Sequence, residues 1–128
     1  MIKLLIVEDN DVLRDTIGDY FNIIPGIDVV SYNGKLGVAN GEDAILCLNQ
    51  NKVDVMLLDL KMPKVDGYEL LKIIKDFPFE FPRIIVFSGY SKESIRQEII
   101  DSGVVDAFVQ KGDSSVLEKL LKLIKNEK

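Results

Sequence analysis

Short apolar runs recur along the chain at intervals long enough for a helix, and this pattern constrains the fold more than any other feature. Four runs, at residues 4–7, 55–58, 84–87 and 107–109, and a weaker one at 27–30 predict buried strands. The runs are continuous and do not alternate with polar residues, which is typical of a parallel sheet covered on both faces. We therefore expect a parallel sheet with helices between its strands.

The segments between these runs carry apolar residues at helical spacing. The first stripe comprises Leu13, Ile17, Tyr20, Phe21 and Ile24. The expected starts of the next four helices are Asn40 as an N-cap, Asp66-Gly67, Ser91, and Ser115 in a capping box with Glu118. Five strands alternating with five helices predict the α/β class, as a doubly wound five-stranded parallel sheet with right-handed crossovers and helices on both faces.

Length and composition exclude several classes of protein. A length of 128 residues fits one domain, residues 1–128. The 16 Lys and Arg against 21 Asp and Glu give a formal charge of −5 without a long basic run, which argues against direct nucleic-acid binding. The one cysteine, Cys47, cannot form an internal disulfide and is expected in the core, and a chain without histidine cannot build the usual zinc sites. The apolar N-terminal stretch is too short for a signal peptide or a membrane span, so we expect a cytoplasmic protein.

Polar side chains follow the predicted strands at the points where the strands end. Glu8 and Asp9 follow the first, Asp59 follows residues 55–58, Ser88 follows residues 84–87, and Lys111 lies two residues after the last. The carboxyl ends of parallel strands meet at one edge of the sheet, which is where open α/β sheets bind ligands. We therefore expect these five residues to converge.

Three converging carboxylates would repel one another unless a cation were bound. Oxygen donors of this kind favour Mg²⁺ or Mn²⁺, which keep open positions for phosphate oxygens. The first strand-to-helix turn lacks the glycine-rich stretch that cradles a nucleotide phosphate. An aspartate can instead act as the nucleophile toward phosphorus, with a metal ion and a lysine neutralising charge, and Asp59 and Lys111 fit these roles.

The chain resembles the receiver (CheY-like) domain of two-component response regulators over essentially its whole length. The motifs that carry the resemblance are Leu5-Ile6-Val7-Glu8-Asp9-Asn10, Leu57-Leu58-Asp59-Leu60-Lys61-Met62-Pro63-Lys64-Val65-Asp66-Gly67, Ser88-Gly89 and Phe108-Val109-Gln110-Lys111. The resemblance implies a flavodoxin-like sheet of strand order 2-1-3-4-5, an order that a chemotaxis receiver already exemplifies.

The resemblance also implies a role for each matching residue. Asp59 would accept the phosphoryl group, and the metal ion would be bound by Asp9, by Asp59, by Glu8 through water and by the backbone carbonyl of Lys61. Lys111 would pair with the phosphate. Ser88 would be the switch hydroxyl, and Phe108 would be the aromatic residue whose rotamer follows it, so that the surface of helix 4, strand 5 and helix 5 changes its affinity for partners.

Three features depart from the pattern of the family or vary within it. Lys111 is followed by Gly112 where most relatives have proline, and because a cis bond before glycine would cost about 3 kcal/mol we expect a trans bond. Residues 33–37 form a short insertion between the second strand and the second helix. Lys61 and Tyr90 occupy the variable positions that in this family tune phosphoryl lifetime.

The implied partners are a histidine kinase or phosphotransfer protein upstream and, downstream, another protein or an effector domain beyond Lys128, with a homodimer through helix 4, strand 5 and helix 5 as a further option. The domain would be a switch that assists its own phosphorylation and dephosphorylation, and not an enzyme. One alternative is a receiver-like interaction module that works without phosphorylation. A phosphatase of the haloacid dehalogenase type is disfavoured because Lys61 stands where that family has a second acid, and a flavin binder is disfavoured by the acidic first turn.

Overall fold

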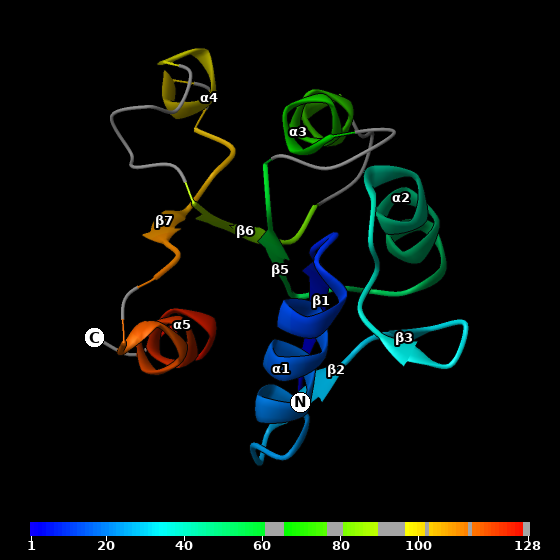
Figure 1. Cartoon of the computed structure of the whole chain (residues 1–128). Helices are drawn as coiled ribbons and strands as arrows, with labels where there is room; N and C mark the ends of the chain where they lie inside the picture. The colour runs from blue at the N-terminus through cyan, green and yellow to red at the C-terminus, as the bar shows by residue number, and fades with distance from the viewer. Residues whose placement is uncertain (61–65, 77–80, 90–96, 102, 113, 127–128) are drawn as a thin grey trace.

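The computed structural model of the chain describes residues 1–60, 66–76, 81–89, 97–101, 103–112 and 114–126 (Figure 1). Its strands are β1 (Ile2–Val7), β2 (Ile27–Val29), β3 (Ser31–Tyr32), β4 (Lys35–Leu36), β5 (Val55–Leu58), β6 (Arg83–Ser88) and β7 (Ala107–Gln110). Its helices are α1 (Asp11–Asn22), α2 (Gly41–Gln50), α3 (Gly67–Lys75), α4 (Gln97–Asp101) and α5 (Val116–Ile124). Within this part of the chain, no helix has both the length and the apolar character needed to cross a membrane.

The main sheet has the order β2-β1-β5-β6-β7, and every pair of neighbours in it is parallel. Counted along this sheet alone, the order is the 2-1-3-4-5 that the sequence led us to expect, so the predicted fold class is confirmed. Figure 1 shows α1 and α5 on one face of the sheet and α2, α3 and α4 on the other. Because the five strands run in the same direction, their carboxyl ends lie together at one edge of the sheet.

The two faces of the sheet carry two separate cores, because successive side chains of a strand point to opposite faces. Under α2 and α3 the sheet contributes Leu5, Val7, Met56, Leu58, Ile84 and Val86. Under α1 and α5 it contributes Leu4, Ile6, Val55, Leu57, Ile85 and Phe87. These residues are at most 4% exposed, which explains why the central strands read as continuous apolar runs.

Side-chain caps fix the beginnings of three helices. Asn10, Asn40 and Asp66 each accept a hydrogen bond from the backbone N–H three residues later, so the predicted cap at Asn40 and the start at Asp66-Gly67 are confirmed. The predicted capping box at Ser115 is wrong: Ser115 precedes α5, but its backbone is not extended (φ −102°, ψ 17°) and its side chain makes no capping hydrogen bond. The predicted start at Ser91 lies outside the described residues.

The insertion at residues 33–37 belongs to a small antiparallel hairpin that the sequence analysis did not predict. β3 pairs with β4 through a two-residue turn in which Asn33 and Gly34 both have positive φ, 52° and 79°. This is the backbone that a two-residue hairpin prefers, and Asn-Gly supplies it at low cost. After the hairpin, Val38 bridges Val7 in parallel and so extends the sheet beside the end of β1.

Candidate functional site

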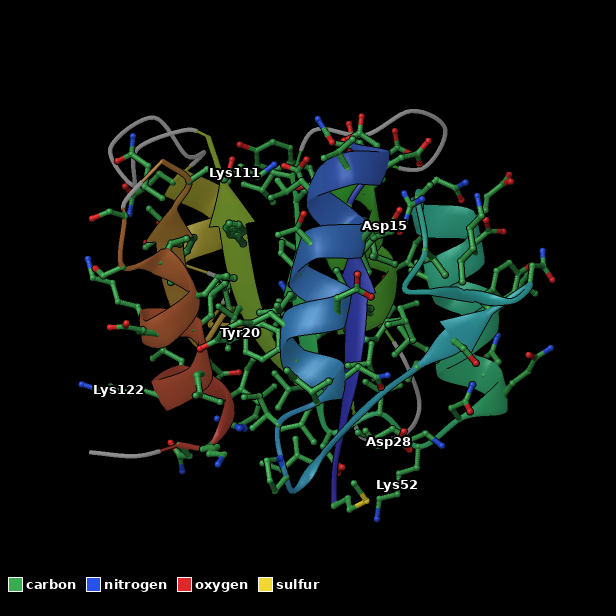
Figure 2. All side chains as sticks on the ribbon, turned by 60° about the horizontal axis from the view of Figure 1, so that its bottom comes forward. Asp15, Tyr20, Asp28, Lys52, Lys111 and Lys122 are labelled. Carbon is green, nitrogen blue, oxygen red and sulfur yellow. The ribbon has the colours of Figure 1, made fainter. Side chains whose placement is uncertain are left out.

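The predicted site residues lie at the carboxyl edge of the main sheet. Glu8 and Asp9 follow β1, Asp59 follows β5, Ser88 ends β6, and Lys111 follows β7. Figure 2 shows Lys111 at one end of the strands and Asp28 and Lys52 at the other. The convergence of Glu8, Asp9, Asp59 and Lys111 follows from the parallel order of the strands, since residues more than 50 positions apart end on the same edge.

Three carboxylates form the centre of the site. One oxygen from each of Glu8, Asp9 and Asp59 lies within 4.8 Å of the others. Glu8 and Asp59 are only 3% and 6% exposed, whereas Asp9 is open to solvent. Two buried acids beside an exposed one leave a way in for a ligand while keeping much of their charge away from water.

Lys111 partly neutralises this cluster. Its Nζ lies 2.5 Å from Oε1 of Glu8 and 3.3 Å from Oδ2 of Asp59, and it also stands 5.6 Å from the centre of the Phe87 ring. The backbone N–H of Lys111 donates to the carbonyl of Ser88 at 2.8 Å, so the end of β7 is tied to the end of β6. The bond between Lys111 and Gly112 is trans, as expected, and Gly112 has a φ of 97°, which glycine tolerates best.

For Glu8 and for Lys111, burial and the hydrogen bond between the two side chains shift the pKa in opposite directions. Burial raises the pKa of the Glu8 carboxyl to about 7, although the hydrogen bond from Lys111 lowers it. For Lys111, burial disfavours the charged form, but the hydrogen bond to Glu8 and the negative charge of Asp59 outweigh it and raise the pKa. One ammonium group thus faces two buried carboxyls, and the site has room in its charge balance for a further cation.

The donor set fits a hard divalent cation. All three side chains offer carboxylate oxygens, the ligands that Mg²⁺ and Mn²⁺ prefer, and the chain has no histidine that would favour zinc. Lys61, whose backbone carbonyl the resemblance adds to the ligands, lies outside the described residues, as does Tyr90. Among the described residues, Glu8, Asp9 and Asp59 are therefore the ones whose side chains could hold the ion.

Ser88 and Phe108, the two residues assigned to switching, lie on neighbouring strands. Ser88 is 2% exposed at the last position of β6. Phe108 is half-buried in β7, is paired in register with Val86, and packs against the core under α2 and α3. Both residues therefore lie near the carboxyl edge of the sheet, where the acidic cluster is.

Sequence reasoning missed two residues that shape the site. A Cβ on Gly67 would lie 2.5 Å from Cα of Leu60 and 2.6 Å from the carbonyl oxygen of Asp59, so α3 approaches the end of β5 more closely than any larger residue allows. Arg14 is 4% exposed on α1 and donates to the carbonyl of Glu8 at 2.8 Å. Gly67 was assigned only to a helix start, and no role was predicted for Arg14.

Comparison with known proteins identifies the family. Residues 4–122 match the response regulator receiver domain, and the chain belongs to this family. It is therefore a receiver domain of two-component signalling. The response regulator protein VraR of Staphylococcus saprophyticus is 33% identical over 129 residues, with 98% of this chain and 58% of that protein covered. The protein-glutamate methylesterase/protein-glutamine glutaminase 3 of Geobacter sulfurreducens is 29% identical over 94% of this chain and 30% of that protein.

The fold has matches among solved structures as well. The response regulator domain of CheB from Thermotoga maritima superimposes with a TM-score of 0.79 at 28% identity, covering 98% of this chain and 95% of that one. The chain thus spans nearly all of a solved receiver domain. It spans only 58% of the Staphylococcus saprophyticus protein and 30% of the Geobacter sulfurreducens protein. What those longer proteins do beyond the receiver domain is a property of their own sequences.

Proposed function

We propose that Asp59 is the phosphoacceptor of this receiver domain. A carboxylate oxygen of Asp59 attacks the phosphorus of a phosphorylated histidine on a kinase or phosphotransfer protein. The new O–P bond makes an acyl phosphate, the N–P bond breaks, and the imidazole leaves with a proton from solvent. A divalent cation held by Glu8, Asp9, Asp59 and the carbonyl of Lys61 would supply charge neutralisation to the phosphoryl oxygens during this transfer.

This proposal rests on the position of Asp59 beside Lys111 and within the acidic cluster. Its Oδ2 lies 3.3 Å from Nζ of Lys111, and its carboxylate also belongs to the acidic cluster. A phosphoryl group on Asp59 would therefore lie near the ammonium group of Lys111 and near the carboxylates that would hold a divalent cation. Glu8 is less suited because it is more tightly paired with Lys111, at 2.5 Å, and because burial raises the pKa of its carboxyl, which favours the protonated form that cannot attack phosphorus.

The signal would then pass through the strands beside Asp59. In this proposal the hydroxyl of Ser88 hydrogen-bonds the phosphoryl group, Phe108 changes rotamer, and the surface formed by α4, β7 and α5 changes its affinity for a downstream protein, an attached effector domain or a second copy of the chain. The domain is the acceptor of the phosphoryl group and assists its loss to water, so it acts as a switch and not as a turnover enzyme. We place this exchange in the cytoplasm.

Intact-mass spectrometry after incubation with Mg²⁺ and acetyl phosphate tests the proposal. The native chain should gain one phosphoryl group, and Asp59→Ala or omission of the metal should abolish the gain. Beryllium fluoride, which mimics an acyl phosphate without hydrolysing as one, covers the case of an adduct lost too fast to weigh. A native chain that gains neither group would indicate an interaction module that works without phosphorylation.

A further inference from the structure

Arg14 is a buried arginine that the proposed phosphoryl transfer does not use. It is the fourth residue of α1 and is 4% exposed. Its Nη1 donates to the carbonyl oxygen of Glu8 at 2.8 Å, and its Nη2 donates to Oδ1 of Asp11 at 2.6 Å. Arginine is rarely buried this fully unless it is paired, and here the guanidinium joins the first turn of α1 to the segment that carries two of the three acids.

Glu8 is also held by hydrogen bonds that do not involve Arg14. Its backbone N–H donates to the carbonyl of Val38 at 3.0 Å, and Val38 in turn donates to the carbonyl of Ile6 at 2.9 Å. Its carboxylate accepts from the backbone N–H of Asn10 at 3.2 Å. Both backbone polar groups of Glu8 are therefore fixed. Its carbonyl accepts from the side chain of Arg14, and its N–H donates to the main chain of Val38.

Gly37, which follows the β3–β4 hairpin, lies against the aliphatic part of the Arg14 side chain. A Cβ on Gly37 would lie 3.3 Å from Cγ of Arg14 and 2.8 Å from the carbonyl oxygen of Ile6, and Gly37 has a φ of 80°. Glycine at this position lets the chain close over the arginine. Arg14 is thus packed along its aliphatic part and hydrogen-bonded at its guanidinium to Glu8 and Asp11.

We propose that Arg14 is a positioning residue that holds the Glu8–Asp9 segment in the arrangement that binds the divalent cation. This inference rests on the proposed function, because it assigns Arg14 a part in building the same metal site. Geometry and charge make opposite predictions here. As a positive charge near the site, Arg14 would weaken cation binding, so its removal would tighten it. As an anchor of the ligands, its removal would weaken binding.

Mn²⁺ binding followed by electron paramagnetic resonance distinguishes the two. We expect Arg14→Met, which removes both hydrogen bonds and the charge, to weaken Mn²⁺ binding about tenfold, the scale at which groups that orient metal ligands act. Arg14→Lys keeps the charge and can donate to one of the two acceptors, so its affinity should fall between those of the native chain and Arg14→Met.

Arg83→Met is the matched control. Arg83 is half-buried at the start of β6, at the opposite edge of the sheet, and donates to the carbonyls of Leu123 and Ile124 at 3.1 and 2.5 Å. It therefore also loses two hydrogen bonds to protein oxygens on substitution. We expect this variant to lose stability while its Mn²⁺ affinity stays within twofold of native.

The result that overturns the inference is an Arg14→Met variant that binds Mn²⁺ as tightly as the native chain or more tightly. Equal weakening in Arg83→Met would overturn it too, because the effect would then be a general loss of stability. If Arg14→Met does not fold, Arg14→Lys decides: weaker binding supports the inference and native binding overturns it. A native chain that fails to bind Mn²⁺ would instead overturn the metal site itself, and with it both proposals.

Discussion

Lys111 and Asp59 stand 52 positions apart in the chain, yet Nζ of Lys111 lies 3.3 Å from Oδ2 of Asp59. They meet because β5 and β7 flank β6 in a parallel sheet and each residue follows the end of its strand. The same Nζ contacts Glu8, which follows β1. The ends of three strands thus place the Lys111 ammonium group beside the buried carboxyls of Glu8 and Asp59. The predictions on Asp59 and Lys111 follow from this balance of charge.

Asp59→Asn should stabilise the fold while removing the phosphoacceptor. The substitution removes one of three carboxylates whose oxygens approach within 4.8 Å, and Lys111 keeps its partner in Glu8. We expect the free energy of unfolding at neutral pH without metal to rise by about 1 kcal/mol. Urea unfolding measures it, with exposed Asp15→Asn as a control near zero. A less stable Asp59→Asn would contradict the picture of a repulsive cluster.

Lys111→Met should have the opposite effect. It leaves buried Glu8 and Asp59 without the ammonium group that pairs with both. Because Lys111 remains 24% exposed on its side chain, solvent limits the loss to about 1–2 kcal/mol in the absence of metal. Added Mg²⁺ should recover more stability in this variant than in the native chain. Lys122→Met provides the control, because Lys122 is exposed on α5. Equal stability of Lys111→Met and Lys122→Met would contradict a stabilising role of Lys111 in the acidic cluster.

Gly67→Ala should damage the fold next to Asp59. The added Cβ would lie 2.5 Å from Cα of Leu60 and 2.6 Å from the carbonyl of Asp59, and backbone atoms there cannot move aside cheaply. We expect a loss of about 1–3 kcal/mol in thermal or urea unfolding, together with slower phosphorylation. Gly89→Ala is the matched control, since a Cβ there would meet no atom of the described residues within 4 Å. Similar stabilities for these two alanine variants would show that α3 is not packed as closely as described.

Cys47 should be unreactive in the folded chain. It is 1% exposed on α2, and burial, followed by the charge of Asp43, raises the pKa of its thiol. A thiol whose pKa is higher when folded holds its proton more tightly in the native state. The stability that the buried Cys47 thiol contributes is therefore present below its unfolded-state pKa of about 8.5. This contribution is lost as the pH rises through the higher pKa that the thiol has in the folded chain. A difference between native and Cys47→Ala stabilities that shrinks above about pH 8.5 would show it, as would labelling by a thiol reagent only after unfolding.

The fold was predictable because its signals are local and redundant. Continuous apolar runs reported burial on both faces of the central strands, and caps such as Asn40 marked helix starts. Ser115 misled because a capping sequence was present while the backbone before α5 adopted another conformation. The β3–β4 hairpin was missed because its strands are two residues long, too short for periodicity, although Asn33-Gly34 is itself a hairpin signal.

The candidate site was predictable in its acids and its lysine because topology alone brings strand ends together. Its supporting residues were not. The contribution of Gly67 depends on how closely α3 approaches Leu60, and that of Arg14 on which carbonyl its guanidinium reaches. Such contacts are set by the packing of elements distant in sequence, and an arginine on a helix or a glycine after an aspartate carries no local sign of them.

Reduction of the phosphorylated chain with borohydride, followed by peptide mapping, tests the central claim most directly. Borohydride converts an aspartyl phosphate to homoserine, so the chemistry marks the residue that carried the group. After incubation with Mg²⁺ and acetyl phosphate, we predict homoserine at position 59 and unchanged residues at Glu8 and Asp9. Reduction at Glu8 or Asp9 with Asp59 intact would contradict the assignment of Asp59 as the phosphoacceptor.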